Sequence, residues 1–136
     1  LVDAKKIYEY LKNKKPKIFK ILKQKILFER RGFKFNNGNV FLKPIFDFKK
    51  NNFLFRYLRD YIEKGYELKK KKLPISFTKA FDKLDSLLTN RKFMKKIKLK
   101  RGDLILLNNH ILAHGRTTFK LGKKSNTRKL YRIWIN

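Results

Sequence analysis

A chain of 136 residues, 42% of them hydrophobic, is long enough to form one domain with a buried core, which argues against disorder. The 38 Lys and Arg residues outnumber the 10 Asp and Glu residues and give a net charge of +28, which is typical of proteins that bind nucleic acid or acidic surfaces. The absence of cysteine excludes disulfides, Cys-based zinc sites and a thiol nucleophile, and it favours a cytoplasmic protein.

The first 32 residues are predicted to be helical. Asp3 can cap a helix at its N-terminus. The apolar residues that follow recur with the 3.6-residue period of a helix, and they are Ala4, Ile7, Tyr8 and Leu11. Pro16 suits the first turn of a second helix, and the apolar residues that continue to Ile26 predict that this helix ends near Arg31.

Residues 39–75 are predicted to form a hairpin followed by an insert. Residues 40–48 and 53–57 are rich in β-forming side chains, and the Lys and Asn residues between them suit a turn. Pro44 has no backbone N–H to donate to a neighbouring strand, so the first strand should lie at an edge of the sheet or carry a bulge there. Residues 57–70 are ambiguous between irregular and helical structure, and residues 69–72 should form a solvated lysine loop.

The remainder is predicted to be one helix followed by strands. Residues 76–92 show a helical apolar face made of Phe77, Ala80, Phe81, Leu84, Leu87 and Leu88. Residues 96–136 favour terminal strands at 97–99, 104–108, 111–114 and 128–135, with a turn at 101–103. The pattern therefore predicts one domain, mainly β with helical insertions (α+β). No apolar run approaches the roughly 20 residues of a bilayer span, so no membrane association is expected.

The sequence contains two histidines, His110 and His114. Their spacing matches the zinc pair of a metalloprotease helix, but no Glu follows the first histidine and the apolar residues between them favour a strand. On a strand the two side chains point the same way, so one could bind a metal while the other supports it.

A longer pattern surrounds these histidines. Residues 102–119 read GDLILLNNHILAHGRTTF, and residues 128–135 read RKLYRIWI. Together they resemble the C-terminal signature of the TauD/TfdA (taurine dioxygenase, clavaminate synthase-like) family of Fe(II)/2-oxoglutarate oxygenases. Weaker likenesses extend upstream through residues 80–85, 56–62 and 44–48. The resemblance implies the C-terminal part of a double-stranded β-helix (jelly roll). It also implies a dioxygenase that oxidises a small organic substrate and releases succinate and CO₂.

The same resemblance implies roles for individual residues. His114 matches an Fe(II) ligand, and Arg128 matches the arginine that pairs with a carboxylate of 2-oxoglutarate, a task that suits the planar fork of arginine. Arg132 lies four residues further on the same strand face and would meet an anionic part of the substrate. The resemblance implies that Asn108, Asn109 and His110 shape the turn before His114 and orient its side chain.

The expected substrate is therefore a small molecule, and Arg132 together with Arg56 or Arg59 hints that it is anionic or amino-acid-like. The substrate's identity and the oligomeric state are left open.

One part of the family pattern is absent. The first ligand pair of the family, His-x-Asp or His-x-Glu, has no counterpart, because no histidine precedes His110. We therefore expect residues 1–136 to be the C-terminal segment of an oxygenase domain, inactive without the missing N-terminal half, and the opening at Leu1 favours this interpretation. Two alternatives stay open: a non-catalytic remnant of an oxygenase, and a basic module that binds nucleic acid through its lysines and aromatic rings. For the leading interpretation no specific nucleic-acid partner is expected.

Overall fold

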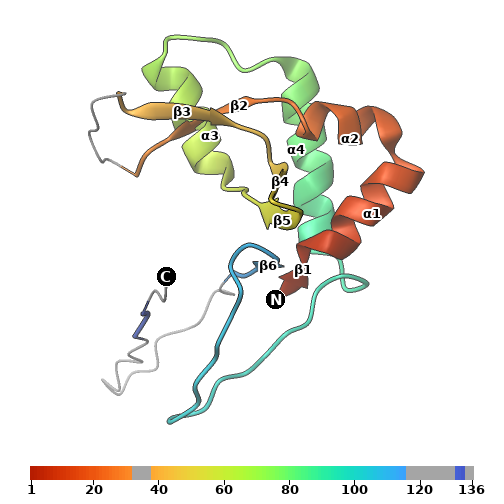
Figure 1. Cartoon of the computed structure of the whole chain (residues 1–136), viewed down its shortest axis with the longest axis vertical. Helices are drawn as coiled ribbons and strands as arrows, with labels where there is room; N and C mark the ends of the chain where they lie inside the picture. Colours follow the sequence, from red (N-terminus) through yellow and green to blue (C-terminus); the bar gives the residue numbers. More distant parts are fainter. Residues whose placement is uncertain (32–37, 116–130, 134–136) are drawn as a thin grey trace, which may run out of the picture.

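The computed structural model describes residues 1–31, 38–115 and 131–133, so Arg128 lies outside the described residues, as does most of the strand predicted at 128–135. Within these ranges the elements run in the order β1, α1, α2, β2, β3, β4, β5, α3, α4 and β6. Helices and short strands are mixed, and each strand pairs with one antiparallel partner: β1 with β6, β2 with β3, and β4 with β5. Helix α4 runs through the middle, with α1 and α2 on one side and β2, β3 and α3 on the other (Figure 1).

The predicted helical start is confirmed as far as Leu22. Helix α1 (Ala4–Lys14) begins at Asp3, whose carboxylate accepts hydrogen bonds from the backbone N–H groups of Lys5 and Lys6 at 2.9 and 3.4 Å. Helix α2 (Pro16–Leu22) begins at the proline, which needs no N–H partner at that position. Helix α1 buries its predicted apolar residues, and α2 buries Leu22 and partly covers Ile18, Phe19 and Ile21, because α2 packs on α1 and on α4.

The prediction that the second helix continues to Arg31 is wrong. The chain leaves the helix after Leu22 and forms strand β2 (Ile26–Glu29), which pairs with β3 (Val40–Lys43). Three consecutive residues of β2 are buried, which requires cover on both faces of the strand, and α3 packs on it. A short apolar run suits helix or strand equally well, so a pairing partner that lies outside the run decided the outcome.

The predicted hairpin forms, but its first strand is shorter than expected. Strands β4 (Phe46–Lys49) and β5 (Asn52–Phe55) pair around Lys50 and Asn51, whose φ angles are 48° and 65°. Two consecutive left-handed residues are the geometry that matches the twist of a two-residue hairpin. Pro44 separates β3 from β4, because proline cannot donate to a ladder.

Residues 57–70, ambiguous in sequence, are largely helical. Helix α3 (Arg59–Leu68) packs on β2 so closely that a Cβ added at Gly65 would lie 3.1 Å from the backbone carbonyl of Leu27. Helix α4 (Ile75–Leu88) follows the lysine loop and buries the predicted apolar face. None of the helices in the described ranges is long and apolar enough to cross a bilayer.

The core lies where α1, α4 and the β4–β5 hairpin meet. Tyr8 of α1 is at its centre, with its ring 5.0 to 5.7 Å, edge to face, from the rings of Phe19, Phe46, Phe48 and Phe53. Such aromatic contacts add to the free energy of apolar burial. The hairpin is therefore fixed against α1, and this places the end of β5 beside the segment that carries the two histidines.

The described C-terminal region contains less strand than predicted. Strand β6 (Leu112–Ala113) pairs with β1 (Val2–Asp3), but no ladder forms at 97–99 or 104–108 in the part of the chain that the structure describes. These residues form a long excursion away from the helices (Figure 1). The excursion turns at Gly102, where φ is 90° and the Asp103 N–H donates to the Lys100 carbonyl at 3.3 Å, so the predicted turn is confirmed. Leu104 and Leu106 are 93% and 81% exposed, because a strand-forming sequence without a neighbouring strand gains no ladder and no cover.

Candidate functional site

A tight turn at residues 108–112 leads to His114. The Asn108 side chain accepts a hydrogen bond from the His110 N–H at 2.9 Å. The Asn108 carbonyl accepts from the N–H groups of Ile111 and Leu112 at 3.1 and 2.9 Å. An asparagine that closes a turn through both its side chain and its backbone is a common turn-forming arrangement. The turn reverses the chain and starts β6.

Hydrogen bonds from two other elements hold this turn in place. The His110 carbonyl accepts from the Phe55 N–H, at the end of β5, at 2.8 Å. The Ile111 carbonyl accepts from the Ala4 N–H, at the start of α1, at 2.9 Å. With the β1–β6 pairing, these bonds fix the backbone that leads to His114, while the imidazole itself is exposed.

The structure brings His114 and Arg132 together. The Arg132 Nη2 lies 3.5 Å from the His114 Nε2. Since a guanidinium has no acceptor, a hydrogen bond between the two atoms requires Nε2 of His114 to be the unprotonated ring nitrogen. That lone pair is the one an imidazole uses to bind a metal. Of the other predicted site residues, Asn109 is exposed on the turn, and Arg128 is outside the described residues.

The described residues do not by themselves form a three-ligand iron site. Among residues 1–31, 38–115 and 131–133, no group of three His, Cys, Asp or Glu side chains lies close enough to hold a metal ion. His114 could supply one nitrogen ligand, whereas a non-haem Fe(II) site needs two histidines and a carboxylate. The remaining ligands are therefore not provided by this part of the chain.

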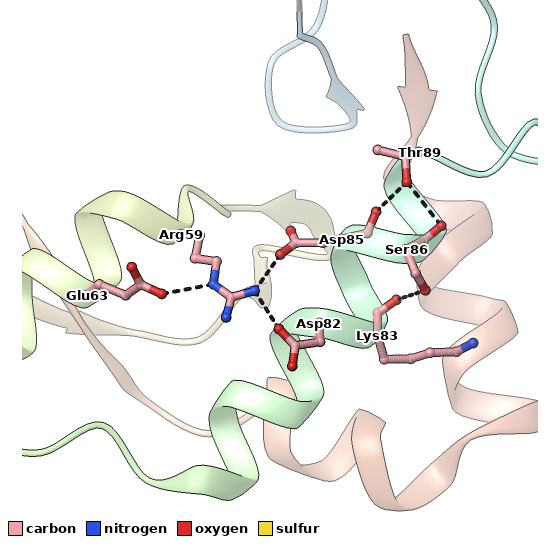
Figure 2. Close-up of polar contacts among 7 residues, drawn as sticks. All are labelled: Arg59, Glu63, Asp82, Lys83, Asp85, Ser86 and Thr89. Carbon is pink, nitrogen blue, oxygen red and sulfur yellow. Dashed lines mark hydrogen bonds and ion pairs between the residues drawn. The ribbon is translucent and has the colours of Figure 1, made fainter.

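Arg59, one of two arginines that sequence reasoning linked to an anionic substrate, binds three carboxylates. It binds Glu63 on its own helix at 2.9 Å, and Asp82 and Asp85 on α4 at 2.7 and 2.8 Å (Figure 2). These hydrogen bonds raise the pKa of Arg59 above its ordinary value. The guanidinium thus joins α3 to α4. The ion pair between Arg59 and Glu63 could have been predicted from the sequence, because residues four apart on a helix lie on the same face.

Arg56, the other arginine, has different surroundings. Its backbone N–H donates to the Ile45 carbonyl at 2.8 Å, but its Nη1 atom is buried without a hydrogen-bond partner. Other atoms of Arg56 line a hollow that Phe28, Phe41 and Tyr61 also line. Sequence reasoning named Arg56 but not these three aromatic residues, because β2, β3 and α3 meet there only in the folded chain.

Comparison with known proteins defines the class. The model of the taurine catabolism dioxygenase TauD, TfdA family matches residues 1–134. The match covers nearly the whole chain, so the chain belongs to this family, and with it to a dioxygenase superfamily. A search of the curated proteins found no match.

Proposed function

We propose that this chain is the C-terminal part of an Fe(II)/2-oxoglutarate-dependent dioxygenase domain that oxidises a small organic substrate and releases succinate and CO₂. Family membership is the observation that carries the proposal. The position of His114 adds to it, because a backbone anchored by α1 and β5 presents the imidazole close to Arg132. Iron, when bound in such a site, supplies the redox chemistry with O₂.

Each predicted site residue has a task in this proposal. His114 provides one nitrogen ligand for Fe(II), and Arg128 pairs with a carboxylate of 2-oxoglutarate. Arg132 contacts an anionic part of the substrate. Asn108, which closes the turn before β6, and its neighbours Asn109 and His110 orient the segment that presents His114.

The exposed C-terminal excursion supports a domain completed by other strands. Residues 104–107 are four consecutive aliphatic residues, and Leu104 and Leu106 are almost fully exposed. Strand-forming segments with exposed apolar side chains and unpaired backbone groups are sites where further strands add. In the proposed jelly roll, those strands and the other two iron ligands come from outside the 136 residues.

The nucleic-acid alternative has less support. Base stacking requires exposed aromatic rings. Of the phenylalanines in the described ranges, five are buried, and they are Phe28, Phe46, Phe53, Phe77 and Phe81. The positive charge alone would give salt-sensitive, non-specific association.

The test uses the natural gene product that contains these residues. With Fe(II), 2-oxoglutarate and O₂ supplied, we expect succinate formation. We expect His114→Ala to abolish it, because one of the three ligands is lost. Arg128→Ala should raise the 2-oxoglutarate concentration required by about tenfold or more, the loss expected for a charge-assisted bidentate pair.

Arg91→Ala removes the same charge from an exposed site and serves as the control, with turnover unchanged. Undiminished turnover in His114→Ala would reject the assignment. A gene product that forms no succinate under any of these conditions would instead favour the non-catalytic remnant. For the 136 residues alone we predict no turnover of 2-oxoglutarate, because they contain a single candidate iron ligand.

A further inference from the structure

The end of α1 and the whole of α2 present a dense positive charge to solvent. Between residues 12 and 25 the chain has seven lysines and no aspartate or glutamate. All seven are exposed, and they are Lys12, Lys14, Lys15, Lys17, Lys20, Lys23 and Lys25. We call them the α1–α2 lysine surface. None of the ion pairs among the described residues includes one of these lysines.

The acidic residues gather on other elements. Of the ten Asp and Glu residues, five lie on α3 and α4. They are Asp60, Glu63 and Glu67 on α3, and Asp82 and Asp85 on α4. Four of these five pair with Arg59 or Lys64. The positive charge of α3 and α4 is therefore partly balanced by carboxylates nearby in the fold, whereas the α1–α2 lysine surface has no carboxylate within its own segment.

The lysines of α2 are placed where they repel one another. Lys17, Lys20 and Lys23 follow at intervals of three residues, and like charges at this spacing on a helix destabilise it. Lys17 also lies in the first turn of α2, which contains no acidic residue, and a positive charge is unfavourable at that end of a helix. A bound polyanion would relieve this repulsion.

The other residues of this segment decide which polyanion fits. The apolar side chains of α2 pack on the core, so the surface has no apolar face to insert into a bilayer. The ring of Phe19, the one aromatic residue between positions 12 and 25, packs against the ring of Tyr8 at 5.0 Å, so bases have no free ring there on which to stack. Lysines without such groups contact phosphates and do not read sequence.

A duplex presents its phosphates as a rigid and regular array of charge, which several lysines on two packed helices can contact at once. We propose that the α1–α2 lysine surface binds the phosphate backbone of double-stranded nucleic acid, independently of its sequence. This binding is separate from the dioxygenase reaction, because Figure 1 shows the corner between α1 and α2 on the far side of α1 from β6.

A second lysine segment offers a matched comparison. Lys96, Lys98 and Lys100 are exposed on the C-terminal excursion and carry the same charge as three lysines of α2. No helix or ladder holds their backbone, so ordering them along a duplex would cost conformational entropy. We therefore expect them to contribute less to duplex binding.

The experiment measures the fluorescence anisotropy of a short labelled DNA duplex titrated with the full chain, between about 50 and 200 mM sodium chloride. Each lysine that contacts a phosphate should add about −0.9 to the slope of log K against log salt concentration. The combined change of Lys17, Lys20 and Lys23 to Gln should make this slope shallower by about 2 to 3, and should weaken binding by at least about tenfold at the lowest salt concentration. The same change at Lys96, Lys98 and Lys100 is the control, and it should alter the slope by less than about 1.

Arginine at the three α2 positions keeps the charge and should restore the binding of the wild type. Equal losses in the two Gln variants would overturn the proposal, because binding would then depend on net charge and not on this surface. No detectable binding of the duplex at low salt would overturn it as well, and so would a strong preference between two duplexes of unrelated sequence. Vesicles that contain phosphatidylserine test the alternative partner, and binding to them without binding to DNA would assign the surface to a membrane instead. The titration contains no iron and no 2-oxoglutarate, so its failure would leave the proposed dioxygenase function untouched.

Discussion

Arg56 and Arg59 lie three residues apart, and their guanidinium groups have opposite surroundings. Arg59 donates to three carboxylates from two helices, whereas the Nη1 of Arg56 is buried without an acceptor. A charge that is paired and hydrogen-bonded contributes to the fold, whereas a buried donor that lacks an acceptor costs free energy.

Tyr57, between these arginines, makes the stability of the chain sensitive to alkaline pH. Burial raises the pKa of its hydroxyl group, and the nearby Asp85 carboxylate raises it further. In the unfolded chain the group ionises near its ordinary pKa of about 10. Above that pH, unfolding releases a proton that the folded state retains, so the stability is fully present below about pH 10 and is lost as the pH rises.

We expect the free energy of unfolding to fall more steeply above about pH 10 for the wild type than for Tyr57→Phe. The difference should be roughly 0.5–1 kcal/mol per pH unit, less than the value for one full proton because the ring is partly exposed. Urea unfolding at several alkaline pH values measures it, and the variant also serves as the control for titration of the lysines. Parallel pH profiles would contradict the prediction.

At the scale of the elements, the contact between α3 and β2 depends on Gly65. Glycine inside a helix is usually a cost, and alanine at such a position stabilises by about 1 kcal/mol. Here a Cβ would lie 3.1 Å from backbone atoms of Leu27 and Glu29. Backbone atoms of a paired strand cannot move aside as a side-chain end can.

We therefore expect Gly65→Ala to destabilise the chain by about 1–3 kcal/mol, the usual range for overpacking. Thermal or urea unfolding measures this value. Ser86→Ala on α4 is the matched control, since Ser86 is exposed, and its unfolding free energy should change by less than about 0.5 kcal/mol. A rise in stability for Gly65→Ala would show that α3 does not approach β2 this closely.

At the scale of the whole molecule, the net charge of +28 opposes folding. The described ion pairs, those of Arg59 and the Lys64–Glu67 pair, involve few of the charges. Salt screens the repulsion among the many unpaired lysines as well as the attraction within these pairs. The first effect should dominate.

We expect the Tm to rise by several degrees between about 20 and 500 mM sodium chloride, because the Debye length shrinks well below the molecular diameter. Differential scanning fluorimetry measures the shift. Potassium chloride should give the same result, since the cause is screening and not a specific cation. A falling Tm would mean that the ion pairs outweigh the repulsion.

The sequence by itself determined the features whose causes are local. The Asp3 cap, the apolar faces of α1 and α4, the β4–β5 turn and the turn at Gly102 depend on residues within a few positions of one another, and all are confirmed. For the candidate site, the sequence motif pointed to His114 and Arg132, which the structure places 3.5 Å apart. The assignment of Arg128 and the roles of all these residues stay predictions.

Only the tertiary structure decided which apolar segments became strands and which arginine was neutralised. Residues 26–29 are a strand because β3 pairs with them and α3 covers them, whereas the aliphatic run at 104–107 forms no ladder in the described chain. Arg59 has two of its three acceptors on α4, more than twenty residues away, whereas the Nη1 atom of Arg56 is buried without one. In each case the deciding partner is distant in the sequence, so composition and periodicity near the residue carry no information about it.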